Sequence, residues 1–175
     1  FSYLAVQLRL RAAGFAVTVH DYDWRQSLDV LAGALAQRLR TDPAPAICIV
    51  AHSMGGLVAR RALQSVDLAR VQRLITLGTP HGGSFGAAQA IRGTYPVVRR
   101  LATLDRLHDA EFLATRVFST FPSLHQMLPP PVPGLSLDLF DADNWPQSGP
   151  RPDPRRGTSL AGRQAADMTP TPVVF

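Results

Sequence analysis

One serine in this sequence has the surroundings that a catalytic nucleophile needs. Ser53 follows a short apolar run, Ile47–Val50, and precedes a segment with helical periodicity, Met54–Gln64. Its neighbours two positions away on each side, Ala51 and Gly55, are small, as a tight turn from a strand into a helix requires. A serine in such a turn, called a nucleophile elbow, projects its hydroxyl above the sheet. The pattern therefore predicts that Ser53 attacks acyl groups.

The helix after Ser53 is expected to supply part of an oxyanion hole. The N-terminus of a helix carries partial positive charge, and the backbone N–H of Met54 is placed to hold a developing oxyanion. In folds with this elbow a second donor comes from a loop that follows an earlier strand. Here that strand would lie before Phe1.

Alternating strands and helices are expected to position the elbow. The expected elements are a helix over 1–13 that ends at Gly14, a strand over 15–19, a helix over 28–41 with Ser27 as its N-cap, the elbow strand, a helix over 54–64 and a strand over 71–77. Such alternation predicts a parallel sheet with working loops at the carboxyl ends of its strands. Those loops are 22–25, the elbow and 78–84.

The rest of the chain predicts a cap and then a proline-rich tail. Residues 87–121 have an irregular helical pattern, and prolines make regular elements unexpected from there to Pro154. A short helix over 159–166 and the start of a strand over 173–175 follow. We expect a single partial domain, 1–175, with a core over 1–84, a cap-like insertion over about 85–155 and a return to the core from about 156.

Composition excludes several classes of function. All 18 basic residues are arginine and the net charge is +5, but no basic stripe carries interleaved aromatic residues, so nucleic-acid binding is not expected. Arg99, Arg100 and Arg106 favour contact with an anionic lipid surface. The chain has no apolar run of about 18 residues and no visible signal peptide, which slightly favours a soluble cytoplasmic protein.

Neither a metal nor a cofactor is expected. Cys48 is the only cysteine and lies in the predicted buried strand, where it would be a small core residue. Asp138, Asp141 and Asp143 form an acidic cluster, but the glycine and the distal glutamate of a calcium loop are missing. A solvated turn is therefore the expected structure there.

Four segments, in the order YDWR, AHSMGG, LITLGTPHGGS and FPSLHQMLP, resemble the lecithin:cholesterol acyltransferase-like family of α/β-hydrolases. The first and last of them are the most particular to that family. The resemblance implies a parallel α/β-hydrolase sheet with a helical cap, and ester hydrolysis or acyl transfer on a lipid through an acyl-enzyme on Ser53. Candidate pocket residues are Trp24, Arg25, His81, Phe112, Phe118 and Phe121; Arg25 is equally well explained as a surface partner of Asp23.

The triad acid and base of that mechanism are not found in the sequence. In this fold they follow the serine in the order Asp or Glu, then His, after later strands. His81 precedes the cap and His125 lies within it, while His52 is expected to pack with its side chain away from Ser53. We therefore expect a domain incomplete at both ends, inactive as residues 1–175 alone. The alternatives are an inactive binding module of the same fold, or a small-ester esterase or thioesterase.

Overall fold

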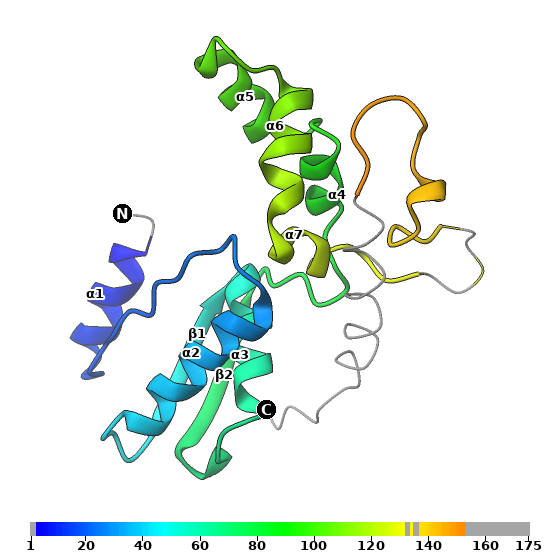
Figure 1. The fold of residues 1–175 in the computed structure, drawn as a ribbon. Helices are drawn as coiled ribbons and strands as arrows, with labels where there is room; N and C mark the ends of the chain where they lie inside the picture. Colours follow the sequence, from blue (N-terminus) through cyan, green and yellow to red (C-terminus); the bar gives the residue numbers. More distant parts are fainter. Residues whose placement is uncertain (1–2, 132–133, 135–136, 153–175) are drawn as a thin grey trace.

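The computed structural model describes residues 3–131, 134 and 137–152, which form an N-terminal helix, a small sheet with two helices, and a separate helical half (Figure 1). The expected helix over 159–166, the strand over 173–175 and the return to the core lie outside these residues. Among the described helices, none combines the length and apolar character needed to cross a bilayer.

Within the described residues the sheet has two parallel strands, β1 (Ile47–His52) and β2 (Val71–Leu77), joined through helix α3 (Met54–Leu63). The β-branched residues of both strands favour this extended structure, and the β–α–β connection confirms the parallel pairing that the alternation predicted. The strands are in register with Ala51 opposite Thr76 and His52 opposite Leu77. Both strands therefore end at the same edge of the sheet.

Only one face of β1 is covered within the described part of the chain. Ile47, Ile49 and Ala51 pack on the core that α2 and α3 form. Cys48 and Val50 point the other way and are exposed. The expected burial of Cys48 is therefore wrong, because a strand residue is buried on both sides only where a second layer covers the sheet.

The first helix ends where the sequence predicted, but the strand after it does not form. Helix α1 (Leu4–Ala12) closes with Gly14 at φ +91°, and the N–H groups of Gly14 and Phe15 donate to the carbonyls of Arg11 and Leu10 at 3.0 and 3.1 Å. This is the Schellman pattern of helix termination. Residues 15–19 then run without any ladder bond to β1 or β2. The prediction of a strand there is wrong, since an apolar run becomes a strand only beside a partner strand.

Helix α2 (Leu28–Thr41) forms the main packing partner of α3. Ser27 caps it as predicted, its hydroxyl accepting from the N–H of Val30 at 3.3 Å. Leu31, Leu35 and Leu39 recur at helical spacing and are buried in the core with α3. A guanidinium group covers the other end of the helix, since Arg70, in the short 3₁₀ turn η1 (Leu68–Arg70), donates to the Leu39 carbonyl at 2.6 Å.

The helical half has its own core. Its elements are α4 (Phe85–Ile91), α5 (Pro96–Asp105), α6 (Ala110–Arg116), η2 (Phe118–Thr120), α7 (Pro122–Gln126) and η3 (Ala142–Asn144). Ile91, Val98 and Leu128 are fully buried at its centre. The expectation that no regular element follows Phe121 is wrong, because α7 begins at Pro122. Pro122 occupies the first helical position, where proline is tolerated.

The acidic cluster forms turns, as expected. The carboxylates of Asp138 and Asp141 accept from the backbone N–H groups of Phe140 and Asp143 at 2.8 and 3.0 Å. Side chains of aspartate commonly stabilise turns in this way. Within the described ranges no three histidine, cysteine or acidic side chains are grouped as a metal site would need.

Candidate active site

Ser53 occupies a strained turn between β1 and α3. Its backbone has φ 52° and ψ −131°, a conformation that residues other than glycine rarely adopt. The turn is held at both sides, because the N–H of Ser53 donates to the Leu77 carbonyl at 2.9 Å and its carbonyl accepts from the N–H of Gly56 at 3.1 Å. Ser53 is exposed, and its hydroxyl makes no hydrogen bond to any described residue.

Met54 is the first residue of α3, and its backbone N–H belongs to the helix turn that has no acceptor within the helix. Its side chain is buried in the core with α2, which fixes the start of the helix. An N–H group held in this way carries part of the positive end of the helix dipole. This arrangement can stabilise negative charge beside Ser53.

The closest approach in the elbow is at Gly56. A Cβ atom on Gly56 would lie 2.0 Å from the Thr79 hydroxyl and 2.7 Å from its methyl group, so only glycine fits. A Cβ atom on Gly55 would lie 3.3 Å from the Tyr22 hydroxyl and 3.9 Å from the Ala51 methyl group. Both glycines are in crowded positions, and the closer approach is that of Gly56 to Thr79 in the loop after β2. The three expected loops thus meet at the elbow through Tyr22, Ser53 and Thr79.

Tyr22 was not among the residues that sequence reasoning singled out. It is half-buried against the core of α2 and α3, with its hydroxyl beside Gly55. Burial, and secondarily the neighbouring Tyr3, raises the pKa of the phenol, so Tyr22 stays protonated and can donate a hydrogen bond. The signal for Tyr22 in the sequence is its place in the YDWR motif, in the loop after residues 15–19.

His81 is held away from the role of a general base. The Arg60 guanidinium donates to Nδ1 at 3.0 Å, and Nε2 lies 3.4 Å from the Thr76 hydroxyl. Burial, followed by the charge of Arg60, lowers the pKa of His81. Both ring nitrogens face partners other than Ser53, which agrees with a structural role.

The other two histidines near the motifs are also accounted for. His125 is fully buried, and its Nε2 donates to the Ser119 carbonyl at 2.8 Å, so its hydrogen bonding is structural. His52 is exposed, with Nδ1 2.9 Å from the Tyr3 hydroxyl. The expectation that His52 is packed is wrong, because it lies on the uncovered face at the end of β1.

The structure brings together three of the six candidate pocket residues. Trp24 meets Phe121 edge to face with ring centroids 5.3 Å apart, and Phe118 lies 5.5 Å from Phe121. Phe112 is apart from this aromatic cluster and stacks on His108 at 4.1 Å. The remaining two, Arg25 and His81, pair with other residues.

Arg25 is a surface partner of Asp23, as one of the two interpretations held. Its guanidinium donates to both carboxylate oxygens, at 2.7 and 2.8 Å. These hydrogen bonds lower the pKa of the Asp23 carboxyl. The pair fixes the loop that carries Trp24.

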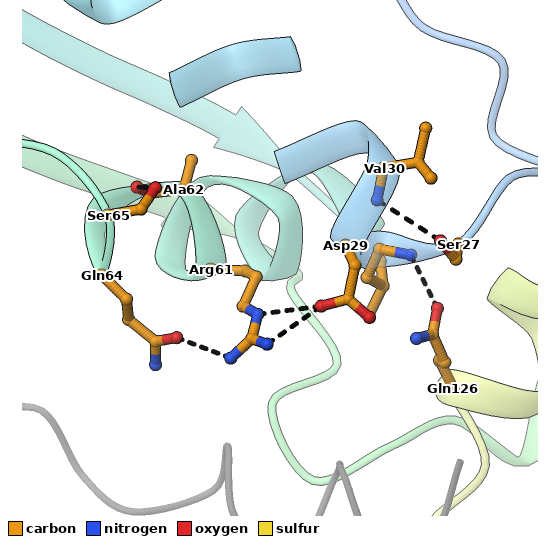
Figure 2. A network of polar contacts seen from close by, with 9 residues as sticks. Ser27, Asp29, Val30, Arg61, Ala62, Gln64, Ser65 and Gln126 are labelled. Atoms are coloured by element: carbon orange, nitrogen blue, oxygen red, sulfur yellow. Dashed lines mark hydrogen bonds and ion pairs between the residues drawn. The ribbon is translucent and has the colours of Figure 1, made fainter. Parts of the chain in front are cut away.

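A network of polar contacts connects α7, in the helical half, to α2 and α3 (Figure 2). The Gln126 side-chain oxygen accepts from the N–H of Leu28 at 2.6 Å, across 98 residues of sequence. Asp29 accepts from Arg61 at 3.0 Å, and Arg61 also donates to Gln64 at 2.8 Å. The first turn of α2 is thus bonded both to α7 and to the elbow helix.

Comparison with known proteins places the elbow within a family match. Residues 28–112 match the sequence model of the PGAP1-like alpha/beta domain, an α/β-hydrolase-like family. The match runs from α2 into α6 and includes Ser53. No curated protein and no solved structure was found to match the chain.

Proposed function

We propose that this protein is a lipid-acting serine esterase or O-acyltransferase that forms its acyl-enzyme on Ser53. The strained conformation of Ser53 between β1 and α3 is the observation that carries the proposal. Strain of this kind persists where the surrounding structure enforces it, and it gathers at functional sites. The match of residues 28–112 to an α/β-hydrolase-like family supports the same reaction class.

In this mechanism the Ser53 oxygen attacks the carbonyl carbon of an ester and loses its proton to a base. The carbonyl oxygen becomes an oxyanion, which the Met54 N–H and the dipole of α3 stabilise. The carbon–oxygen bond to the alcohol then breaks, the alcohol leaves with the proton, and the acyl group stays on Ser53. Water or a second alcohol takes the acyl group in the reverse sequence.

A lipid substrate is favoured by the aromatic cluster of Trp24, Phe118 and Phe121. These rings join the YDWR loop to the helical half, and the Trp24 side chain is exposed while Phe118 and Phe121 are half-buried. Each buried methylene of an acyl chain contributes about 0.8 kcal/mol. A chain longer by a few carbons therefore gains orders of magnitude in affinity.

The first test is covalent labelling of the natural gene product with a fluorophosphonate probe. We expect the wild-type protein to be labelled and Ser53→Ala to be silent. Ser65→Ala is the matched control, because Ser65 is also exposed but its hydroxyl donates to the Ala62 carbonyl at a helix end. Labelling that survives Ser53→Ala, or a silent wild-type protein, overturns the nucleophile and favours an inactive binding module.

The second test separates lipid from small-ester substrates. Wild-type protein that has not been treated with the probe is assayed on p-nitrophenyl esters from acetyl to long-chain acyl groups, with and without an added alcohol as acceptor. We expect kcat/KM to rise steeply with chain length. Equal kcat/KM for acetyl and long-chain esters identifies a small-ester esterase or thioesterase instead, and the product with added alcohol distinguishes transfer from hydrolysis.

A further inference from the structure

Helix α5 presents an apolar stripe to solvent. Val97, Leu101 and Leu104 stand at positions i, i+4 and i+7, which places them on one face of the helix. They are 54%, 43% and 71% exposed, and Leu107, just after the helix, is 83% exposed. The inward face is a different one, on which Val98 is fully buried. Four apolar side chains, three on one face of α5 and one just after the helix, are therefore exposed to solvent.

Three exposed arginines lie on or just after α5, and their guanidinium groups have no partner among the described residues. Arg99 and Arg100 are exposed on α5, and Arg106 ends the helix in a left-handed conformation at φ 59°. Among the described residues, none of the three guanidinium groups makes a hydrogen bond or an ion pair. By contrast, Arg70 and Arg92 bind backbone carbonyls within the fold. The charges on α5 are thus available to a partner.

The position of α5 suits an outward contact. It packs against α6 and projects at the end of the helical half farthest from the two strands (Figure 1). Its one acidic residue, Asp105, is engaged with His108 at 3.0 Å. The apolar stripe thus lies away from the elbow.

We propose that α5 docks on a lipid bilayer that contains anionic phospholipids. Amphipathic helices with arginine on the polar face lie in the membrane interface with the apolar face toward the acyl chains. In that orientation Val97, Leu101 and Leu104 enter the boundary of the acyl region, and the guanidinium groups meet lipid phosphates, which they bind well. The inference goes beyond the proposed esterase activity and does not require it.

A second copy of the chain fits this surface less well. In a two-fold contact each α5 would face another α5, so the unpaired arginines would approach arginines. Like charges brought together in an interface disfavour the contact. The stripe also has too few side chains for the roughly 1,200 Å² that a stable interface buries. A bilayer with anionic lipid offers phosphate groups to the arginines and acyl chains to the apolar stripe.

The test is a vesicle sedimentation assay on the full chain carrying Ser53→Ala, which leaves the lipids intact. Vesicles are pure phosphatidylcholine or contain about a third phosphatidylserine. The variants are Leu101→Ser with Leu104→Ser, and Arg99→Gln with Arg100→Gln. Leu68→Ser and Arg9→Gln are matched controls, because both residues are exposed and lie on other elements. Unfolding curves confirm that each variant folds like the parent.

We expect the parent to bind the phosphatidylserine vesicles more strongly, and added salt to weaken that binding. The leucine pair should lower the partition coefficient at least about tenfold, and the arginine pair roughly thirtyfold. Both controls should bind like the parent. Unchanged binding by the leucine pair, equal binding to both vesicle types, or a concentration-dependent dimer that the leucine pair abolishes would overturn the proposal. This result does not depend on the proposed function. If the fluorophosphonate probe failed to label Ser53 of the wild-type protein, the expected binding of α5 to the vesicles would be the same.

Discussion

Replacing Gly56 by alanine tests the geometry of the elbow most directly. The new methyl carbon would lie 2.0 Å from the Thr79 hydroxyl, 2.7 Å from the Thr79 methyl group and 2.8 Å from the Thr79 Cβ atom. Carbon atoms pack at about 3.5–4.0 Å. Helix α3 and the loop after β2 must therefore separate by more than an ångström at this point. We expect Gly56→Ala to unfold more easily and to lose labelling at Ser53.

The magnitude follows from two opposing terms. Overpacking in a well-packed region costs about 1–3 kcal/mol. Alanine in place of glycine in a helix gains up to about 1 kcal/mol. Gly33→Ala in α2 isolates the second term, because Gly33 is exposed and its Cβ would meet nothing within 4 Å. Both variants gain the helix term, so their changes in the free energy of unfolding should differ by the overpacking cost alone, about 1–3 kcal/mol.

The assay is urea denaturation followed by far-ultraviolet circular dichroism, with the slope checked for constancy. Thr79→Ala in the Gly56→Ala background removes the two nearest atoms and should restore at least about 1 kcal/mol. Thr79→Ala alone should cost little through its hydroxyl, since that group is buried without a hydrogen-bond partner among the described residues. If Gly56→Ala is as stable as Gly33→Ala, or if the two changes are simply additive, the close approach does not exist.

Three further predictions concern neighbouring groups. Gly55→Val should displace the Tyr22 hydroxyl and slow fluorophosphonate labelling, whereas Gly55→Ala should be milder; an unchanged rate for valine would count against the packing. Gln126→Ala leaves the partly buried N–H of Leu28 without its acceptor and should cost about 1–3 kcal/mol in urea unfolding, while Gln126→Glu keeps the acceptor and should lose less. The pKa of His81 is lowered below 6.5 by burial, so the unfolded chain binds the proton more readily and stability is lost as pH falls below that value. His81→Asn should flatten the pH dependence of unfolding in this window, and an unchanged profile would refute the assignment.

The elements around the elbow were predictable because their signals are local. Ser27 marks the start of α2, Gly14 marks the end of α1, and short β-branched runs mark the two strands. Each of these signals depends on backbone geometry within a few residues. The position of Ser53 between a strand and a helix follows from them.

The expected strand over 15–19 and the burial of Cys48 failed for a different reason. Both depend on a neighbour, either a partner strand or a second layer, and an apolar pattern does not specify that neighbour. For the same reason, the six candidate pocket residues did not all come together. Trp24 meets Phe121 and Phe118, while Phe112 meets His108, and no spacing along the chain distinguishes these pairings.

The sequence by itself determined the nucleophile candidate, its flanking elements and the small residues that the turn requires. Only the tertiary structure decided that Gly56 meets Thr79, that Tyr22 lies beside Gly55 and that α5 turns its apolar stripe outward. Local propensity is encoded within a few residues, whereas a contact between distant segments depends on how whole elements pack.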